Sequence, residues 1–329
     1  MEELILKFNE IGIYNINKVG RKNATLGEMY NNLASKGVRI PNGFAITAKA
    51  YKYFIEYNKL RSPLQELMSK LETAEFSNLT EIGSKARKLI LEGRFPLDLE
   101  TSIATAYNCL SNNKKREIVV VVRSSPSAEN NFTDNFSGLH DSFLNIKGIV
   151  PLVYAVKCCF ASLYTDRAIK HRQNKCFDHN KVFLSVGIQK MVRSDLGCSG
   201  TGFTLESESA LPGMVHIAGT WGLGETITEG TVAPDEFIVL KNSLKNNKIA
   251  ILQKKLGSKS KILVSNENAS GINSTVMKIT PRKCTERFVL EDQEIEYLAR
   301  WAVIIEDYYQ RPVDFEWAKD GLSGELYII

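Results

Sequence analysis

Two acidic residues near the C-terminal end of the chain could hold a metal ion. Asp314 and Glu316 alternate with Val313, Phe315 and Trp317. Because side chains alternate between the two faces of a strand, this pattern predicts a strand with carboxylates on one face and large apolar residues on the other. Two such carboxylates can bind Mg²⁺, which takes oxygen ligands and usually bridges to substrate phosphates. The alternative is a half-buried strand whose polar face is only solvated.

Two basic residues could bind phosphate groups. Arg123 directly follows the β-branched run at residues 118–122, which is typical of a strand covered on both faces. A guanidinium at the end of a strand suits phosphate because its planar fork forms bidentate hydrogen bonds. Lys22 lies just before a predicted helix and could reach a phosphate as a point charge. The alternatives are a surface ion pair for Arg123 and a solvated side chain for Lys22.

Two glycine-bearing segments could also contact a nucleotide. Residues 124–138 are rich in small hydroxylic residues and could form a lid whose backbone N–H groups approach phosphate oxygens closely. The alternative is an ordinary exposed loop. Residues 219–225 contain three glycines but match neither the P-loop nor the dinucleotide-binding spacing. Glu225 in this segment would repel a phosphate, so its carboxylate better suits ribose hydroxyls or a metal.

Composition narrows the class of protein. With 329 residues, 43% of them hydrophobic, the chain can bury a sizeable core in two or three subdomains. The net charge of +5 fits a polyanionic ligand such as a nucleoside triphosphate and is too small to indicate nucleic acid. The six cysteines show neither zinc spacing nor a disulfide framework. We see no signal peptide and no apolar run long enough to span a bilayer, so we expect a cytoplasmic protein without a membrane partner.

The elements that must position these residues follow from apolar spacing and turn signals. We predict helices at 23–36, 48–57, 150–174 and 290–309, helical stretches within 62–111, and strands at 44–46, 118–122, 182–191, 215–218, 236–240 and 313–318. Thr47 is expected to cap the second helix, and Gly37 to end the first. We also predict a turn at 197–202 and a flexible excursion at 242–285. Strands and helices without a strict βαβ rhythm indicate an α+β fold.

Several segments together resemble, in collinear order, the N-terminal domain of the phosphoenolpyruvate synthase (pyruvate, water dikinase) family. They are residues 19–29, 41–45, 122–125, 138–145, 159–168, 186–195, 221–225 and 234–237, followed by the closing strand. The resemblance covers essentially the whole chain and is more specific than any single motif.

The resemblance implies an ATP-grasp domain with an N-terminal lobe at 1–185 and a C-terminal lobe at 186–329 that clasp ATP. In this family ATP phosphorylates a histidine on a separate swivelling domain. That domain carries the phosphate to pyruvate in a barrel-shaped domain. The overall reaction converts pyruvate, ATP and water into phosphoenolpyruvate, AMP and phosphate, a step of gluconeogenesis.

The family's functional residues can be carried over to matching positions of this sequence. The resemblance implies phosphate binding and catalysis by Lys22 and Arg123, a lid containing Ser137 and Gly138, an adenine hinge at Gln189 and Met191, a ribose contact from Glu225, and Mg²⁺ binding by Asp314 and Glu316.

The family continues past the last strand with a Gln-Ala-Arg-Pro run that supplies a metal ligand and a phosphate ligand, and the sequence ends at Ile329 before it. We therefore expect this chain to bind ATP weakly and not to complete the reaction alone. Two alternatives stay open. One is the ATP-binding domain of a rifampicin-phosphotransferase-like protein, and the other is a stand-alone nucleotide-sensing module.

Overall fold

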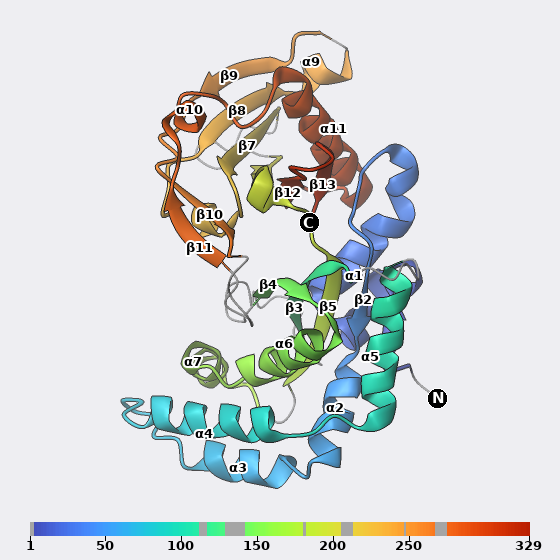
Figure 1. Cartoon of the computed structure of the whole chain (residues 1–329), viewed down its shortest axis with the longest axis vertical. Coiled ribbons are helices and arrows are strands. Elements are labelled where there is room, and N and C mark those ends of the chain that lie inside the picture. The colour runs from blue at the N-terminus through green and yellow to red at the C-terminus, as the bar shows by residue number, and fades with distance from the viewer. Residues whose placement is uncertain are drawn as a thin grey trace. The chain divides into compact units, whose positions relative to one another are not determined.

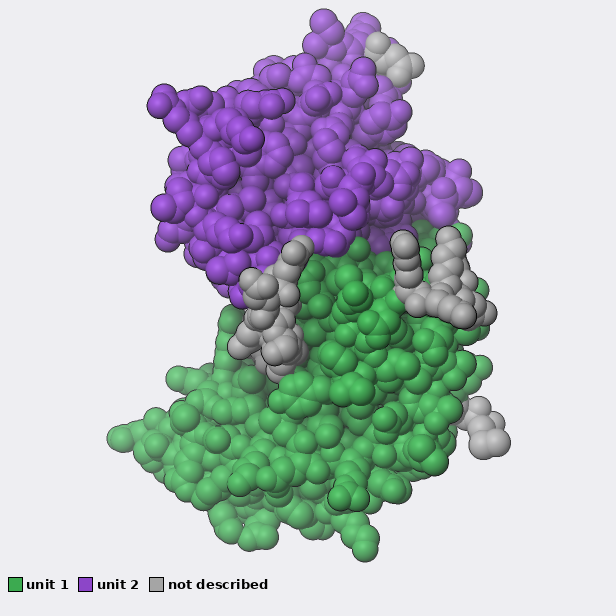
Figure 2. Space-filling model, viewed as in Figure 1, with its two compact units in different colours: residues 1–31, 42–191, 270–273 green, residues 32–41, 192–269, 274–329 purple. Residues whose placement is uncertain are grey.

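The computed structural model describes residues 3–111, 117–128, 142–179, 182–204, 213–246, 248–266 and 275–329. Helices and sheets are both present, so the α+β prediction is confirmed. The described chain forms two compact units, coloured separately in Figure 2. The first unit holds residues 3–31 and 42–191, and the second holds residues 32–41, 192–266 and 275–329, each with the gaps given above.

The first unit is built on an antiparallel sheet of strand order β1-β2-β5-β3-β4 (Figure 1). The strands are β1 (Ile5–Lys7), β2 (Gly43–Ile46), β3 (Val119–Ala128), β4 (Ser142–Lys147) and β5 (Val182–Lys190). The helices are α1 (Ile16–Asn32, whose last residue belongs to the second unit), α2 (Ala48–Tyr57), α3 (Arg61–Ser69), α4 (Leu79–Glu92), α5 (Leu97–Leu110), α6 (Ile149–Ser162) and α7 (Asp166–Asn174).

The two faces of this sheet differ in character. Directly opposed residues of antiparallel strands share a face, so the register assigns each side chain. One face carries apolar residues that join the core formed with the helices, namely Val120, Val122, Leu184, Val186 and Ile188. The other face carries Val121, Arg123 and Ser125 of β3 opposite Gln189, Gly187 and Ser185 of β5. The side chains of this second face are therefore mostly polar or small.

Helix α1 packs on the polar face through two glycines. The amide Nδ2 of Asn23 donates to Ser185 Oγ at 3.1 Å, and a Cβ on Gly187 would lie 2.2 Å from Asn23 Oδ1. Gly20 interrupts the helix with φ 73°, and a Cβ there would lie 2.3 Å from Ser125 Oγ. Only glycine allows both this backbone conformation and this close approach. The second segment of α1 therefore starts beside Ser125.

The second unit is built on a sheet of strand order β13-β12-β6-β7-β8-β9, with a separate ribbon of β10 and β11 (Figure 1). The strands are β6 (Cys198–Phe203), β7 (Met214–Trp221), β8 (Asp235–Leu240), β9 (Ile251–Lys255), β10 (Lys261–Ser265), β11 (Thr275–Ile279), β12 (Asp314–Lys319) and β13 (Leu326–Ile328). The helices are α8 (Glu225–Thr228), α9 (Lys241–Lys245), α10 (Arg282–Thr285) and α11 (Asp292–Tyr309), and α11 packs against β7, β8 and β9.

Several local predictions are confirmed. Helix α2 begins after Thr47, whose side chain accepts a hydrogen bond from the Ala50 N–H. The prediction that Gly37 ends the first helix is wrong, because α1 ends at Asn32, and Gly37, with φ 88°, instead ends the short 3-10 helix at Ala34–Lys36. Strand β5 and helix α11 lie where the spacing predicts them. Strand β12 alternates as expected, because Phe315 and Trp317 are buried while Asp314 is exposed.

The single helix predicted at 150–174 is wrong. The chain forms α6 and α7, and Thr165 caps α7 by accepting from the Ala168 N–H. The stretch Ile149–Asn174 is long and apolar enough to cross a membrane by length and composition, contrary to the sequence expectation, and 50% of its most apolar window is buried in the protein. Its apolar residues, including Leu152 and Phe160, belong to the core of the first unit.

Two further predictions are wrong, one for the segment 197–202 and one for the segment 242–285. The predicted turn at 197–202 is strand β6. A Cβ on Gly200 would lie 2.8 Å from the Trp317 ring, and one on Gly202 would lie 2.2 Å from the Phe315 ring. These glycines therefore make room for aromatic residues of β12. The described part of 242–285 holds β9, β10, β11 and α10 and is not the irregular segment that its polar composition predicts.

Candidate functional site

Arg123 lies inside strand β3, not at its end. The strand continues to Ala128 and pairs with β5 over its whole length, from Val120 opposite Lys190 to Ala128 opposite Val182. The start of the predicted lid, residues 124–128, is therefore strand, because pairing with the apolar strand β5 outweighs the loop-like composition. The predicted lid residues Ser137 and Gly138 lie outside the described residues.

Two buried polar atoms on this strand have no hydrogen-bond partner among the described residues. Arg123 Nη1 and Ser125 Oγ are both buried without a hydrogen bond to any part of the chain that the structure describes. The two residues are separated by one position, so their side chains leave the same face of β3. A buried donor without a partner costs about 1–3 kcal/mol. An anionic ligand that accepts hydrogen bonds here would remove that cost.

Lys22 lies near the start of the second segment of α1, next to this face. Gly20 has non-helical dihedral angles and divides α1 into two segments, so Lys22 lies in the first turn of the second segment. A helix N-terminus carries partial positive charge and favours anions. The contact between Gly20 and Ser125 thus brings the backbone of Lys22 close to the strand that holds Arg123. Lys22 itself is exposed.

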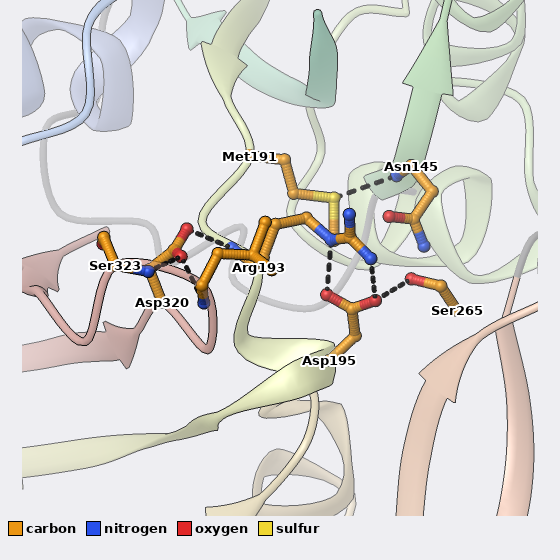
Figure 3. Close-up of polar contacts among 8 residues, drawn as sticks. Asn145, Met191, Arg193, Asp195, Ser265, Asp320 and Ser323 are labelled. Carbon is orange, nitrogen blue, oxygen red and sulfur yellow. Dashed lines mark hydrogen bonds and ion pairs between the residues drawn. The ribbon is translucent and has the colours of Figure 1, made fainter.

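Gln189 lies near the end of β5, and Met191 directly follows this strand. Gln189 is 3% exposed and shares the polar face with Arg123. The Met191 N–H donates to the Val119 carbonyl at 3.0 Å, and its Sδ accepts from the Asn145 N–H at 3.1 Å (Figure 3). The chain passes from the first unit to the second directly after Met191.

A cluster of charged and polar residues forms hydrogen bonds to the chain just after Met191. The Arg193 guanidinium donates from Nε and Nη2 to the two carboxylate oxygens of Asp195, each at 2.9 Å, and Ser265 Oγ donates to Asp195 Oδ2 at 2.6 Å (Figure 3). The Arg193 N–H also donates to Asp320 Oδ2 at 3.0 Å. Burial would raise the pKa of Asp195, but the bonds from Arg193 and Ser265 outweigh it and hold that pKa below its usual value.

The sequence analysis missed this cluster. Its only local signal is an Arg and an Asp two residues apart, directly after the predicted hinge residue Met191. Ser265 and Asp320 are far away in the sequence, so the spacing of residues could not connect them.

Glu225 is the first residue of α8 and follows a loop that is tied to two strands. Gly222 adopts φ 81°, and a Cβ there would lie 2.3 Å from the Leu263 carbonyl oxygen. The Leu223 N–H donates to that same carbonyl at 2.9 Å, and Ser199 Oγ donates to the Gly222 carbonyl at 2.6 Å. These bonds set where Glu225, which is partly buried, starts its helix.

Asp314 and Glu316 share one face of β12, as predicted. They lie opposite Phe203 and Thr201 of β6. Among the described residues, no group of three or more His, Cys, Asp or Glu side chains could hold a metal ion. The pair nevertheless fits Mg²⁺, which usually keeps several waters and takes one or two carboxylates plus substrate phosphates.

The same face of this sheet also carries hydroxyl groups. Ser199 of β6 lies opposite Ala318 of β12 and opposite Thr220 of β7. Thr220 Oγ1 is buried and has no hydrogen-bond partner within the described ranges. Ser199 reaches the loop before Glu225, so this loop borders the face that holds Glu316.

The structure therefore groups the predicted residues within each unit. The first unit brings Lys22, Arg123 and Gln189 to the α1 side of its sheet. The second unit brings Glu225 to the border of the face that carries Asp314 and Glu316.

Comparison with known proteins agrees with the sequence resemblance. Residues 16–329 match the family described as pyruvate phosphate dikinase, AMP/ATP-binding domain. The phosphoenolpyruvate synthase of Aquifex aeolicus is 43% identical over 333 residues, which cover 99% of this chain and 39% of that protein. The corresponding protein of Pseudomonas aeruginosa is 41% identical, with 100% and 42% covered. That of Escherichia coli is 40% identical, with 99% and 41% covered. The chain thus spans about two fifths of the length of these relatives.

Proposed function

The chain belongs to the pyruvate phosphate dikinase AMP/ATP-binding domain family, and from this we propose that it binds ATP with Mg²⁺ as the nucleotide-binding part of a phosphoenolpyruvate synthase. The ATP-grasp fold is part of the proposal. We assign the N-terminal lobe, predicted as residues 1–185, to the first unit and the C-terminal lobe, predicted as 186–329, to the second. We also propose a cytoplasmic location.

The observation that carries this proposal is Arg123 Nη1, which has no hydrogen-bond partner in the described part of the chain. It is buried on the same face as Ser125 Oγ, beside the helix segment that begins after Gly20. A guanidinium, a hydroxyl and helix N–H groups are all donors that suit a polyphosphate. The sheet thus holds a charge and two buried donors ready for an anion, a feature that a purely structural strand does not need.

Each candidate residue has a proposed role. Lys22 and Arg123 bind the ATP phosphates, Gln189 and Met191 contact the adenine, Glu225 contacts the ribose, Asp314 and Glu316 hold Mg²⁺, and Ser137 and Gly138, which lie outside the described residues, form part of the lid.

Phosphoryl transfer needs alignment and charge neutralisation more than covalent chemistry. When bound, Mg²⁺ neutralises charge on the phosphates. Lys22 and Arg123 add positive charge and fix the direction in which the terminal phosphate points. Asp314 and Glu316 stand on a rigid strand, so the position of their carboxylates changes little between states.

The whole reaction is proposed from the relatives. We propose that the phosphate passes to a histidine on a separate swivelling domain, and then to pyruvate in a barrel-shaped domain. Pyruvate, ATP and water would give phosphoenolpyruvate, AMP and phosphate. The length of the relatives, of which this chain matches about two fifths, supports such further domains.

Calorimetric titration of the chain with ATP, with and without Mg²⁺, tests the proposal. The variant D314N/E316Q is the perturbation, and D307N, which alters an exposed carboxylate on α11, is the matched control. We expect Mg²⁺ to strengthen ATP binding in the unaltered chain and in D307N, but not in D314N/E316Q. An equal response to Mg²⁺ in all three proteins would exclude this metal site, and the absence of any saturable ATP binding would exclude the proposed function.

A further inference from the structure

A pocket lies in the first unit and is lined by none of the residues assigned above. Its volume is about 280 Å³. It is lined by Tyr51, Lys52, Ile55 and Glu56 of α2, Arg61 and Leu64 of α3, and Tyr164, His179, Val182 and Phe183. Its size is near the lower end of small-molecule sites, which suggests a compact ligand.

A buried arginine stands behind the pocket wall. Arg172 of α7 is 2% exposed. Its Nε donates to His179 Nδ1 at 3.0 Å, and its Cζ lies 5.7 Å from the centre of the Tyr164 ring. Across the described parts of the chain, no carboxylate lies within ion-pair distance of Arg172, although it carries a full charge that it cannot shed. A buried charge normally requires a partner of opposite sign.

The polar part of the pocket wall consists of neutral side chains that can donate hydrogen bonds to an anion. Tyr51 and Tyr164 are both buried and hydrogen-bonded to each other, and burial raises the pKa of each hydroxyl. Burial and the charge of Arg172 lower the pKa of His179 to about 4. Since His179 Nδ1 accepts from Arg172, its Nε2 carries the proton and faces Gln173 Oε1 at 3.4 Å. These groups do not neutralise the arginine.

The charged side chains in the lining also favour an anion. Lys52 and Arg61 are cationic, and Glu56 is the one carboxylate among the lining residues. Together with Arg172 behind the wall, the positive charges outnumber the negative one. The remainder of the lining, including Ile55, Leu64 and Phe183, is apolar.

We propose that this pocket binds a small organic carboxylate, with its anionic group facing Tyr51, Tyr164 and the charge of Arg172, and its apolar body against Ile55 and Leu64. The charge would compensate the buried guanidinium, and the apolar wall would discriminate such a ligand from inorganic anions. A nucleoside triphosphate is too large and too polar for the apolar wall. The proposal does not depend on the nucleotide site, because the pocket and that site have no residue in common.

Benzoate is the probe, and benzamide is its neutral control of the same shape. The full chain is titrated with each compound by NMR and by calorimetry. We expect saturable benzoate binding and at least about tenfold weaker benzamide binding, because a charge-assisted hydrogen bond contributes about 1.5–3 kcal/mol. Equal affinity for the two compounds, or no saturable binding of benzoate, would overturn the proposal.

Variants locate the bound benzoate. Arg172→Met is expected to weaken benzoate binding by at least about tenfold. Arg61 is exposed, so Arg61→Gln keeps the protein folded and should weaken benzoate binding even if the Arg172 variant fails to fold. Lys88→Gln removes another exposed positive charge, on α4 and outside the pocket, and should leave benzoate binding unchanged. Unaltered affinity in Arg61→Gln and in folded Arg172→Met would overturn the proposal.

A final measurement separates this pocket from the nucleotide site. We expect benzoate to bind equally well to the unaltered chain, to the Arg123→Met variant and in the presence of saturating ATP. Loss of benzoate binding in Arg123→Met, or competition by ATP, would show that benzoate occupies the nucleotide site and would refute the proposed carboxylate site in this pocket.

Discussion

Arg123→Met should weaken ATP binding without destabilising the protein. The buried Nη1 has no hydrogen-bond partner among the described residues, and an unsatisfied buried donor costs about 1–3 kcal/mol. Methionine keeps much of the apolar volume and removes that donor, so we expect the free energy of unfolding without ligand to stay the same or to rise by about 1 kcal/mol. The lost charge-assisted hydrogen bonds to phosphate, each about 1.5–3 kcal/mol, should raise the Kd for ATP about 10- to 100-fold.

The measurement combines urea unfolding of the ligand-free protein with calorimetric titration of ATP. Arg193→Met is the informative contrast, because it leaves the Asp195 carboxylate, 2% exposed, without its bidentate partner. Breaking a buried pair from one side costs about 3–5 kcal/mol, so that variant should lose stability. Arg94→Met, at an exposed position, should change neither quantity.

The reasoning about Arg123 would be refuted by either of two results. One is a loss of more than about 1 kcal/mol in unfolding free energy for Arg123→Met, which would mean that Nη1 has a stabilising partner. The other is an unchanged Kd for ATP in a folded Arg123→Met protein, which would mean that the guanidinium does not meet the phosphates.

Three further substitutions test other parts of the structure. Gly20→Ala should lower the free energy of unfolding by about 2 kcal/mol or more in a urea titration, because φ 73° disfavours alanine and its Cβ would lie 2.3 Å from Ser125 Oγ; an unchanged midpoint would contradict the close packing of α1. Asp195→Asn should lower the free energy of unfolding at neutral pH. The difference in unfolding free energy from the unaltered chain should shrink as the pH falls below 3.8 and through the lowered folded-state pKa of Asp195, because the unaltered carboxyl is then protonated too. A pH-independent difference in urea titrations would count against the ion pair. The free energy of unfolding of the unaltered chain should fall as the pH is lowered from 6.5 to about 4. In this range the unfolded state binds a proton at His179 and the folded state does not. His179→Gln should lack that part of the pH dependence, and identical pH profiles for the two proteins would show that His179 does not titrate as described.

Local sequence patterns determined the elements that depend on near neighbours. Thr47 caps α2 because a hydroxyl can accept from an N–H three residues later, and this needs no other part of the chain. The alternation in β12 placed Asp314 and Glu316 on one face because the period of a strand is a property of its backbone. The collinear resemblance identified the family, since it sums many short segments along the whole chain.

Tertiary structure alone decided where residues from distant segments meet. Gly200 lies in strand β6, where a Cβ would come 1.9 Å from the Ala218 carbonyl oxygen and 2.8 Å from the ring of Trp317, which is more than a hundred residues later. Asp195 accepts hydrogen bonds from Ser265 as well as from Arg193. Arg123 lies within β3 because β3 pairs with β5 as far as Ala128. Packing and hydrogen bonding act between neighbours in space, so contacts across long loops leave no periodic signal in a single sequence.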